Sequence, residues 1–186
     1  MSENTEIDFG PLSALIGVWE GDRGEDVAPE PEGKETNPYY ETLSFDVVGD
    51  VTNAESQTLV VLRYLQIVTR KSDDAVFHHE TGYWMWDAER ETVMHSLAIP
   101  RAVTLLAGGK VRREGDTLVF EVAAKQGDPD WGICQSPFMR DNAKTTAFTH
   151  TISVTGDELS YSETTLLDIY GRSFEHTDRN ILTRQR

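Results

Sequence analysis

From residue 38 onward the chain consists of short segments of strand type, and most connections between these segments are no longer than a tight turn. In residues 39–48 (YYETLSFDVV), for example, Leu43 and Phe45 alternate with polar residues, a period of two that is typical of a strand with one buried face. Short connections join antiparallel neighbours, because parallel strands need long crossovers. The candidate strands are residues 39–48, 57–69, 75–87, 91–99, 102–107, 110–113, 117–124, 145–155, 158–167 and 173–184.

No segment of ordinary helix length shows a period of 3.6 residues. The one predicted helical turn is residues 11–16 (PLSALI), in which Pro11 suits the first position of a helix. About ten antiparallel strands in one domain leave sheet edges, and closing the sheet removes those edges completely. We therefore predict an all-β fold, an up-and-down antiparallel β-barrel of about ten strands with a short N-terminal helical turn, in preference to a two-sheet sandwich. A barrel of this size is filled by side chains or holds one small ligand.

The length predicts a single β-barrel domain over residues 1–186. Residues 1–10 are predicted as a flexible tail, and residues 24–38, which are acidic and rich in Pro and Gly, as a long loop. A second long loop is predicted over residues 127–144. This loop carries several large apolar side chains, Trp131 among them, so we expect it to form a lid on a pocket or a plug on one end of the barrel.

Asp and Glu outnumber Lys and Arg by 32 to 17, which gives a formal net charge of −15. Such an excess of carboxylates argues against binding to nucleic acid or to anionic membrane surfaces, because both need clustered positive charge. Cys134 is the only cysteine, so the chain forms no intramolecular disulfide. The sequence shows neither a secretory signal nor an apolar run of membrane-spanning length, and we expect a cytoplasmic protein. These features are also compatible with a homodimer.

The histidines are the main candidates for chemistry, because the sequence has none of the common nucleotide-binding, zinc-protease or serine-hydrolase motifs. On a strand His78 and Glu80 share one face, and His95 from the next strand would complete a three-ligand zinc site. Ordinary polar contacts are the more common role of such residues. His176 lies in the last predicted strand, and a lone histidine is more often structural than a ligand. On these residues alone we favour no metal site.

Residues 14–21 (ALIGVWEG) resemble the start of lipocalins and fatty-acid-binding proteins, in which a helical turn leads into a first strand with a Gly-x-Trp motif. Gly17 and Trp19 form that motif here. In this superfamily a basic residue of the last strand packs across the tryptophan at the closed end of the barrel. The resemblance therefore implies a structural cation–π contact between Trp19 and either Arg184 or Arg186.

Two further segments narrow the resemblance. Residues 78–83 (HHETGY) resemble the H-x-E-T-G-Y stretch of the nitrobindin family, and residues 156–162 (GDELSYS), followed by a strand with a histidine, resemble that family's C-terminal region. The chain is thus similar to the nitrobindin-like haem-binding β-barrels, within the lipocalin and fatty-acid-binding-protein superfamily. The resemblance implies a closed barrel with ferric b-type haem in a pocket open to the surface. It also implies nitric oxide binding and, for some members, peroxynitrite isomerisation, so the chain is either an enzyme of that kind or a binding protein.

Carried over to this chain, the resemblance makes His176 the axial ligand of the haem iron, and hence the metal ligand. It assigns Gly21 and Gly24, which follow Trp19, to the cofactor site. His176 and Arg184 are eight residues apart, so both face the same side of a regular strand and lie roughly 26 Å from each other. If Arg184 covers Trp19 at the closed end, His176 points into the barrel near its open mouth.

The leading prediction is a barrel that binds haem b through His176. The alternative is a non-haem carrier of a fatty acid or another small hydrophobic molecule in a preformed cavity. An arginine would receive the carboxylate of such a ligand, and the sequence favours none of Arg63, Arg101, Arg112 and Arg140 for that role. A third hypothesis is a barrel filled by aromatic side chains, used for oligomerisation or for contact with a partner.

Overall fold

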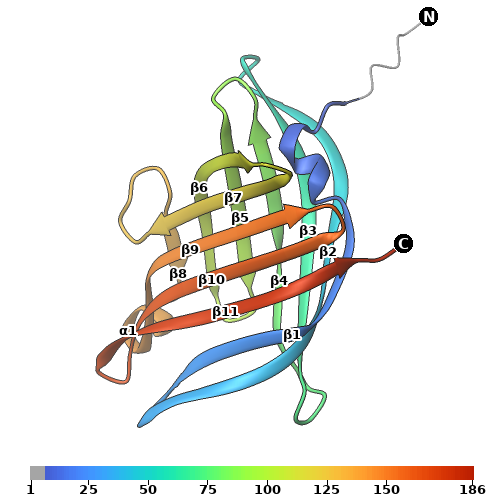
Figure 1. The fold of residues 1–186 in the computed structure, drawn as a ribbon. Coiled ribbons are helices and arrows are strands. Elements are labelled where there is room, and N and C mark those ends of the chain that lie inside the picture. Colours follow the sequence, from blue (N-terminus) through green and yellow to red (C-terminus); the bar gives the residue numbers. More distant parts are fainter. Residues whose placement is uncertain (1–6) are drawn as a thin grey trace, which may run out of the picture.

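The computed structural model describes residues 7–186, most of which belong to one antiparallel sheet (Figure 1). Among these residues the helical elements are a 3₁₀ turn, η1, and a short helix, α1. The elements in chain order are η1 (Gly10–Ala14), β1 (Gly17–Glu30), β2 (Gly33–Asn53), β3 (Gln57–Arg70), β4 (Val76–Asp87), β5 (Thr92–Ile99), β6 (Val103–Glu114), β7 (Thr117–Lys125), β8 (Ile133–Gln135), α1 (Pro137–Asn142), β9 (Ala143–Thr155), β10 (Glu158–Ile169) and β11 (Arg172–Arg184). No helix of the described residues is long and apolar enough to cross a membrane.

The sheet closes into a barrel. In ring order its strands are β5, β4, β3, β2, β1, β11, β10, β9, β7 and β6, and pairing between β5 and β6 closes the ring. Every pairing is antiparallel, and the three-residue β8 pairs with the first residues of β6. The predicted up-and-down barrel with its N-terminal helical turn is therefore confirmed, since ten strands form the closed ring.

The prediction of separate strands over residues 102–107 and 110–113, with a turn at Gly108 and Gly109 between them, is wrong, because one long strand, β6, runs through both segments. Both glycines lie inside this strand. A Cβ atom on Gly109 would lie 1.8 Å from the backbone oxygen of Glu121 on the neighbouring β7. Glycine is needed at position 109 because the adjacent strand approaches closely, which is one of the common reasons for a glycine inside a strand.

The prediction of a long loop over residues 24–38 is also wrong. These residues form the outer part of a hairpin between β1 and β2, with Gly24 paired to Tyr39 and Glu30 paired to Gly33. The period of two is weak here because the inward-facing residues of this hairpin, Asp26 and Ala28, line a cavity and are not packed in an apolar core. Polar inward positions removed the alternation on which the strand prediction depends.

Residues 127–144 contain β8, α1 and the first two residues of β9. Ser136 caps α1 by accepting a hydrogen bond from the backbone N–H of Met139 at 3.3 Å. Met139 lines the cavity at one end of the barrel, and Trp131 packs against the buried core. The sequence left two alternatives for this segment, a lid on a pocket or a plug on one end of the barrel. In the structure one part of the segment lines the cavity and another part packs against the core.

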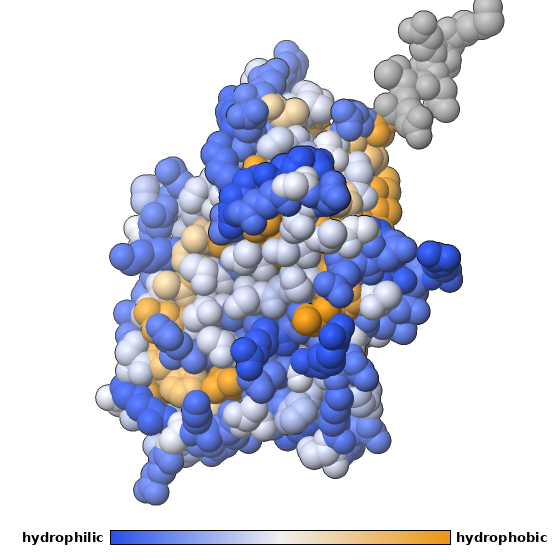
Figure 2. All heavy atoms as spheres, viewed as in Figure 1, coloured by the Kyte–Doolittle hydropathy of each residue, from blue (hydrophilic) through white to orange (hydrophobic). Residues whose placement is uncertain are grey.

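The predicted tail over residues 1–10 is too long, because Phe9 packs against the core and Gly10 begins η1. Residues 1–6 of this predicted tail lie outside the described residues. On the face of the barrel that Figure 2 shows, hydrophilic side chains predominate, as expected for a chain of this net charge.

Trp19 closes one end of the barrel and is completely buried. Its indole N–H donates a hydrogen bond to the backbone oxygen of Leu15 at 2.7 Å, and the guanidinium of Arg184 lies 4.0 Å from the centre of its ring. Arg184 also donates to the backbone oxygens of Ala14 (2.9 Å) and Ile16. Arg184 therefore holds the connection between η1 and β1 against the last strand. The Arg186 side chain, in contrast, is 91% exposed.

Gly17 starts β1 with a φ of 122°, a backbone conformation that residues with side chains rarely adopt. Its Cα faces Arg184, since a Cβ there would lie 3.5 Å from the arginine Nη1. Gly17, Trp19 and Arg184 thus form one structural unit at the closed end. From this end a core of fully buried side chains, including Trp84 and Phe120, fills about the middle of the barrel.

Replacing Arg184 by Ala removes the cover of Trp19 and the hydrogen bonds to the η1–β1 connection. We expect the free energy of unfolding to fall by about 2–3 kcal/mol, because hydrogen bonds from charged groups and a cation–π contact each contribute on the order of 1–3 kcal/mol. Urea unfolding followed by tryptophan fluorescence measures this loss. Arg186→Ala is the matched control and should change stability by less than about 0.5 kcal/mol; equal losses in the two variants would contradict the assignment.

Candidate functional site

A cavity of about 380 Å³ lies inside the barrel at the end away from Trp19. Its walls come from strands on all sides of the ring, together with α1 and the start of β9. Along β11 the inward side chains run from His176 and Asp178, which line the cavity, to Leu182 and Arg184 at the closed end. One barrel therefore combines a packed end with a hollow end.

One wall of the cavity is apolar. Leu97 and Ile99 of β5, Val103 and Leu105 of β6, and Phe148 of β9 line it. In the closed ring of strands β5 lies five places from β11 in either direction, so this wall stands across the barrel from β11. A flat or elongated apolar ligand would find a hydrophobic surface here.

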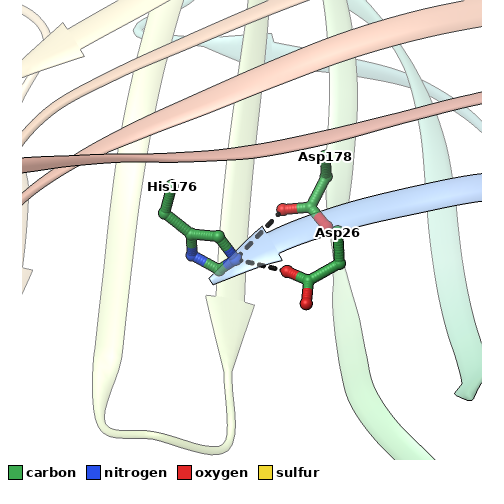
Figure 3. A group of neighbouring side chains, drawn as sticks. All are labelled: Asp26, His176 and Asp178. Atoms are coloured by element: carbon green, nitrogen blue, oxygen red, sulfur yellow. Dashed lines mark hydrogen bonds and ion pairs between the residues drawn. The ribbon is translucent and has the colours of Figure 1, made fainter. Parts of the chain in front are cut away.

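His176 lies on the opposite wall, facing the cavity as its predicted strand alternation requires. Its Nε2 is 2.6 Å from Oδ1 of Asp26 on β1 and 3.5 Å from Oδ2 of Asp178 on β11 (Figure 3). The pair Asp26–Asp178 is directly in register across the β1–β11 ladder. Asn37 of β2 donates a hydrogen bond to the second oxygen of Asp26 at 2.9 Å and so fixes its orientation.

These contacts set the charges of the group formed by Asp26, His176 and Asp178. Burial alone raises the pKa of Asp26, but the hydrogen bonds from His176 and Asn37 and the charge of His176 hold it below its usual value. Burial lowers the pKa of His176, and the neighbouring carboxylates more than offset this and raise it overall. Burial and the charge of Asp26 raise the pKa of Asp178 to about 6, although His176 acts in the opposite direction. The two neighbouring carboxyl groups thus favour the protonated form of the imidazole.

A second polar group, centred on Glu80, lies beside the first. The side chain of Glu80 is almost completely buried, accepts a hydrogen bond from the Tyr64 hydroxyl at 2.7 Å, and lies 3.5 Å from Nε2 of His78. His79 is exposed on the other face, as strand alternation predicts. His95 does not join this pair in a metal site, since both its ring nitrogens are without a hydrogen-bond partner and its ring stacks on Trp84 at 4.3 Å.

His95 and His150 form a buried imidazole pair, with ring centres 5.5 Å apart. Burial lowers the pKa of His95 to about 3, helped by the charge of His150, and lowers the pKa of His150 to about 4. Glu163 lies 3.4 Å from His150 at the cavity wall, and burial and nearby carboxylates raise its pKa well above the usual value. The two imidazoles are therefore neutral at pH 7, as deep burial requires.

The glycines assigned to the cofactor site have a packing role. A Cβ on Gly24 would lie 2.0 Å from the ring of Tyr39, and a Cβ on Gly21 would lie 2.7 Å from the backbone oxygen of Ile181. Neither glycine belongs to the cavity wall. Both lie at a bulge where β1 shifts its register against β2 and β11, and close contacts explain them.

Of the four arginines considered as receptors for a ligand carboxylate, one lies at the cavity wall. Arg101 lines the cavity, while the other three form ion pairs elsewhere: Arg63 with Asp46, Arg112 with Glu114 and Glu121, and Arg140 with Asp141. Arg70, which the sequence analysis missed, also lines the cavity. Its Nε is buried, has no hydrogen-bond partner among the described residues, and lies 3.4 Å from Oδ1 of Asp73 in an ion pair.

Sequence reasoning also missed Asp26 and Asp178. Asp178 lies two residues from His176 on the same face of β11, and that spacing was a usable signal. Asp26 gave no such signal, because its position depends on the pairing of β1 with a strand that lies 150 residues further along the chain.

A closed barrel with a cavity that has one apolar and one charged wall defines a small-ligand-binding β-barrel. A family model described as "THAP4-like, heme-binding beta-barrel domain" matches residues 8–184. The chain therefore belongs to this family of haem-binding β-barrel domains, and the resemblance to nitrobindin-like barrels is confirmed. The crystal structure of Rv2717c from M. tuberculosis is similar, with a TM-score of 0.69 and 26% identity, over 96% of this chain and 100% of that one. No curated protein matches the chain.

Replacing His95 by Phe keeps an aromatic ring against Trp84 and removes two nitrogens without partners. Below pH 6.5 the unfolded wild type binds a proton at His95, whereas the folded protein does so only near pH 3, so the wild type loses stability as the pH falls. We expect the stability advantage of the variant to grow by about 1.4 kcal/mol per pH unit below 6.5.

Urea unfolding at pH 7, 6 and 5 measures this difference. His79→Phe is the control, because His79 is exposed and lies on the outer face of the same barrel. If wild type and His95→Phe lost stability in parallel between pH 7 and pH 5, the buried imidazole would not be the neutral group described.

Proposed function

We propose that the cavity binds haem b and that Nε2 of His176 is the protein ligand of its iron. The observation that carries this proposal is the position of His176, whose side chain lines the cavity from β11 while the apolar wall of β5 and β6 stands across from it. A porphyrin needs one imidazole nitrogen and apolar surfaces against its faces. The membership of the chain in a haem-binding family supports the same ligand.

The residues fit this group at three points. Leu97, Leu105 and Phe148 supply an apolar surface, and His176 supplies the nitrogen. At the cavity wall, the Nε of Arg70 makes an ion pair with Asp73 at 3.4 Å but no hydrogen bond to any described residue, and among the same residues Arg101 donates only to a backbone oxygen, at 3.4 Å. Arginine is well suited to carboxylates such as the haem propionates.

Asp26 opposes the iron, because both require Nε2 of His176. An imidazole ligates a metal in its neutral form, whereas Asp26 stabilises the protonated ring. Haem binding therefore requires His176 to give up its proton and its contact with Asp26, which keeps its hydrogen bond from Asn37. The affinity of this chain for haem depends on that exchange.

When bound, ferric haem would supply an open coordination position for nitric oxide or for isomerisation of peroxynitrite to nitrate, the activities implied by the nitrobindin resemblance. The apolar side chains of β5 and β6 that line the cavity would exclude water from a bound ligand. Burial and nearby carboxylates raise the pKa of Glu163 at the cavity wall, which disfavours a negative charge there.

A second candidate is a non-haem carrier of a small hydrophobic carboxylate. The guanidinium of Arg70, which lines the cavity together with the apolar wall and whose Nε makes a long ion pair with Asp73 but no hydrogen bond, favours it specifically. Mass spectrometry of small molecules extracted from the purified native protein separates the two candidates. Haem in the extract supports the first proposal, and a fatty acid without haem supports the second.

Adding ferric haem to the haem-free protein should produce a Soret band that saturates at one haem per chain. His176→Ala should abolish the band or weaken haem binding at least about tenfold, because the iron loses its only protein ligand in this proposal. Absorption titration measures the effect. His79→Ala, which removes an exposed imidazole of the barrel's outer face, should bind haem like the wild type; an unchanged Soret band in His176→Ala would refute the ligand assignment.

Asp26→Asn should tighten haem binding at least about tenfold, because a hydrogen bond between charged groups that competes with the iron is worth on the order of 1.5–3 kcal/mol. The same Soret titration gives the affinity. Asp46→Asn removes one carboxylate from an exposed surface pair with Arg63 and should leave the affinity unchanged. Weaker haem binding by Asp26→Asn would show that Asp26 supports the ligand and does not compete with it.

A further inference from the structure

We propose that Asp26, His176 and Asp178 bind one divalent transition-metal ion in the haem-free protein. Among the described residues this is the group whose potential ligand atoms come together: one imidazole nitrogen and two carboxylate oxygens, all within 4.8 Å of one another. The three side chains converge on one point at the cavity wall (Figure 3). The proposal of this ion site does not depend on the proposed haem function, although the ion and the haem iron would use the same nitrogen of His176.

The geometry is close to that of a bound ion. Imidazole nitrogens and carboxylate oxygens lie about 2.0–2.2 Å from such ions, so neighbouring ligand atoms are about 3 Å apart. Nε2 of His176 is 2.6 Å from the oxygen of Asp26 and 3.5 Å from that of Asp178. Small side-chain rotations bring all three atoms to ligand distance, since Asp26 and Asp178 are already paired in register on adjacent strands.

The charges around the group call for a cation. Asp26 is 3% exposed, and among the ion pairs of the described residues neither it nor Asp178 has Lys or Arg as a partner. Glu80, itself buried, adds a further carboxyl group to the same cavity wall. A buried carboxylate is normally paired or bound to metal, and His176 is the basic partner that the buried Asp26 shares here with the half-buried Asp178.

The surroundings also prepare the ligands. Asn37 holds one oxygen of Asp26 and leaves the other directed at His176. Such outer partners orient metal ligands and are a regular part of metal sites. On its other side the group faces the cavity, which leaves room for water molecules or a substrate to complete the coordination.

One imidazole and two carboxylates select the class of ion. Mg²⁺ and Ca²⁺ prefer sites made entirely of oxygen ligands, whereas Mn²⁺, Fe²⁺, Co²⁺ and Zn²⁺ accept mixed nitrogen and oxygen ligands. Co²⁺ is the most informative probe of this class, because its visible absorption reports the coordination.

The experiment uses the full-length protein, freed of metal by a chelator and shown to be haem-free by its absorption spectrum. Adding Co²⁺ should produce visible absorption that saturates at one ion per chain, and Zn²⁺ should displace it. Asp178→Asn and His176→Ala should each weaken Co²⁺ binding at least about tenfold. Asp46→Asn, with the same loss of one surface carboxylate, should bind as the wild type does.

Proton NMR of the wild type with Co²⁺ tests the site without any substitution. One strongly shifted exchangeable proton is expected, from Nδ1 of the single ligating imidazole. No shifted proton, shifted protons from two imidazoles, or equal Co²⁺ affinity in the wild type and Asp178→Asn would each overturn the proposal.

These experiments can refute the haem proposal and the ion proposal separately. Co²⁺ binding without a Soret band removes only the haem proposal, and a Soret band without Co²⁺ binding removes only the ion site. Asp26→Asn provides the sharpest contrast, since it should tighten haem binding and weaken Co²⁺ binding. Tighter Co²⁺ binding by Asp26→Asn would contradict the ion site, whereas weaker haem binding would contradict only the competition between Asp26 and the iron.

Discussion

The antiparallel ladder between β1 and β11 joins the first and last strands of the chain, and both ends of the barrel depend on it. At the closed end it pairs Trp19 with Arg184, which seals the barrel and fastens η1. At the hollow end it pairs Asp26 with Asp178, beside His176. The structural contact and the candidate site are thus two outcomes of one register, although they differ completely in chemistry.

Between these ends the interior contains a buried polar layer. The carboxylate of Glu41 accepts hydrogen bonds at 2.9 Å from Gln66, Tyr161 and Asn180, and burial raises its pKa to about 7. On β11, Asn180 lies between the cavity residues and Leu182 of the core. The layer therefore separates the apolar core from the charged cavity, and its complete hydrogen bonding makes this burial tolerable.

The sequence predicted the closed barrel well, because short turns and a period of two are local features that leave few alternatives for so many strands. It also predicted that His176 and Arg184 share a face, which needs only strand parity. It failed at the β1–β2 hairpin, where Asp26 and Ala28 take inward positions that local patterns assign to apolar residues. The sequence could not predict Asp26 as the partner of His176, because the register between two strands at opposite ends of the chain produces no local sequence pattern.

The bulge in β1 has a consequence for how this fold can vary. Seven residues separate Trp19 from Asp26, whereas six separate their partners Arg184 and Asp178. That single extra residue reverses the parity of β1, so that both Trp19 and Asp26 face inward. Loss of that extra residue would make β1 regular and leave Trp19 and Asp26 six positions apart, an even number, so that both side chains would still face inward. The bulge is thus the point at which β1 can lose a residue while the sealed end and the ligand chemistry of the mouth both stay as they are.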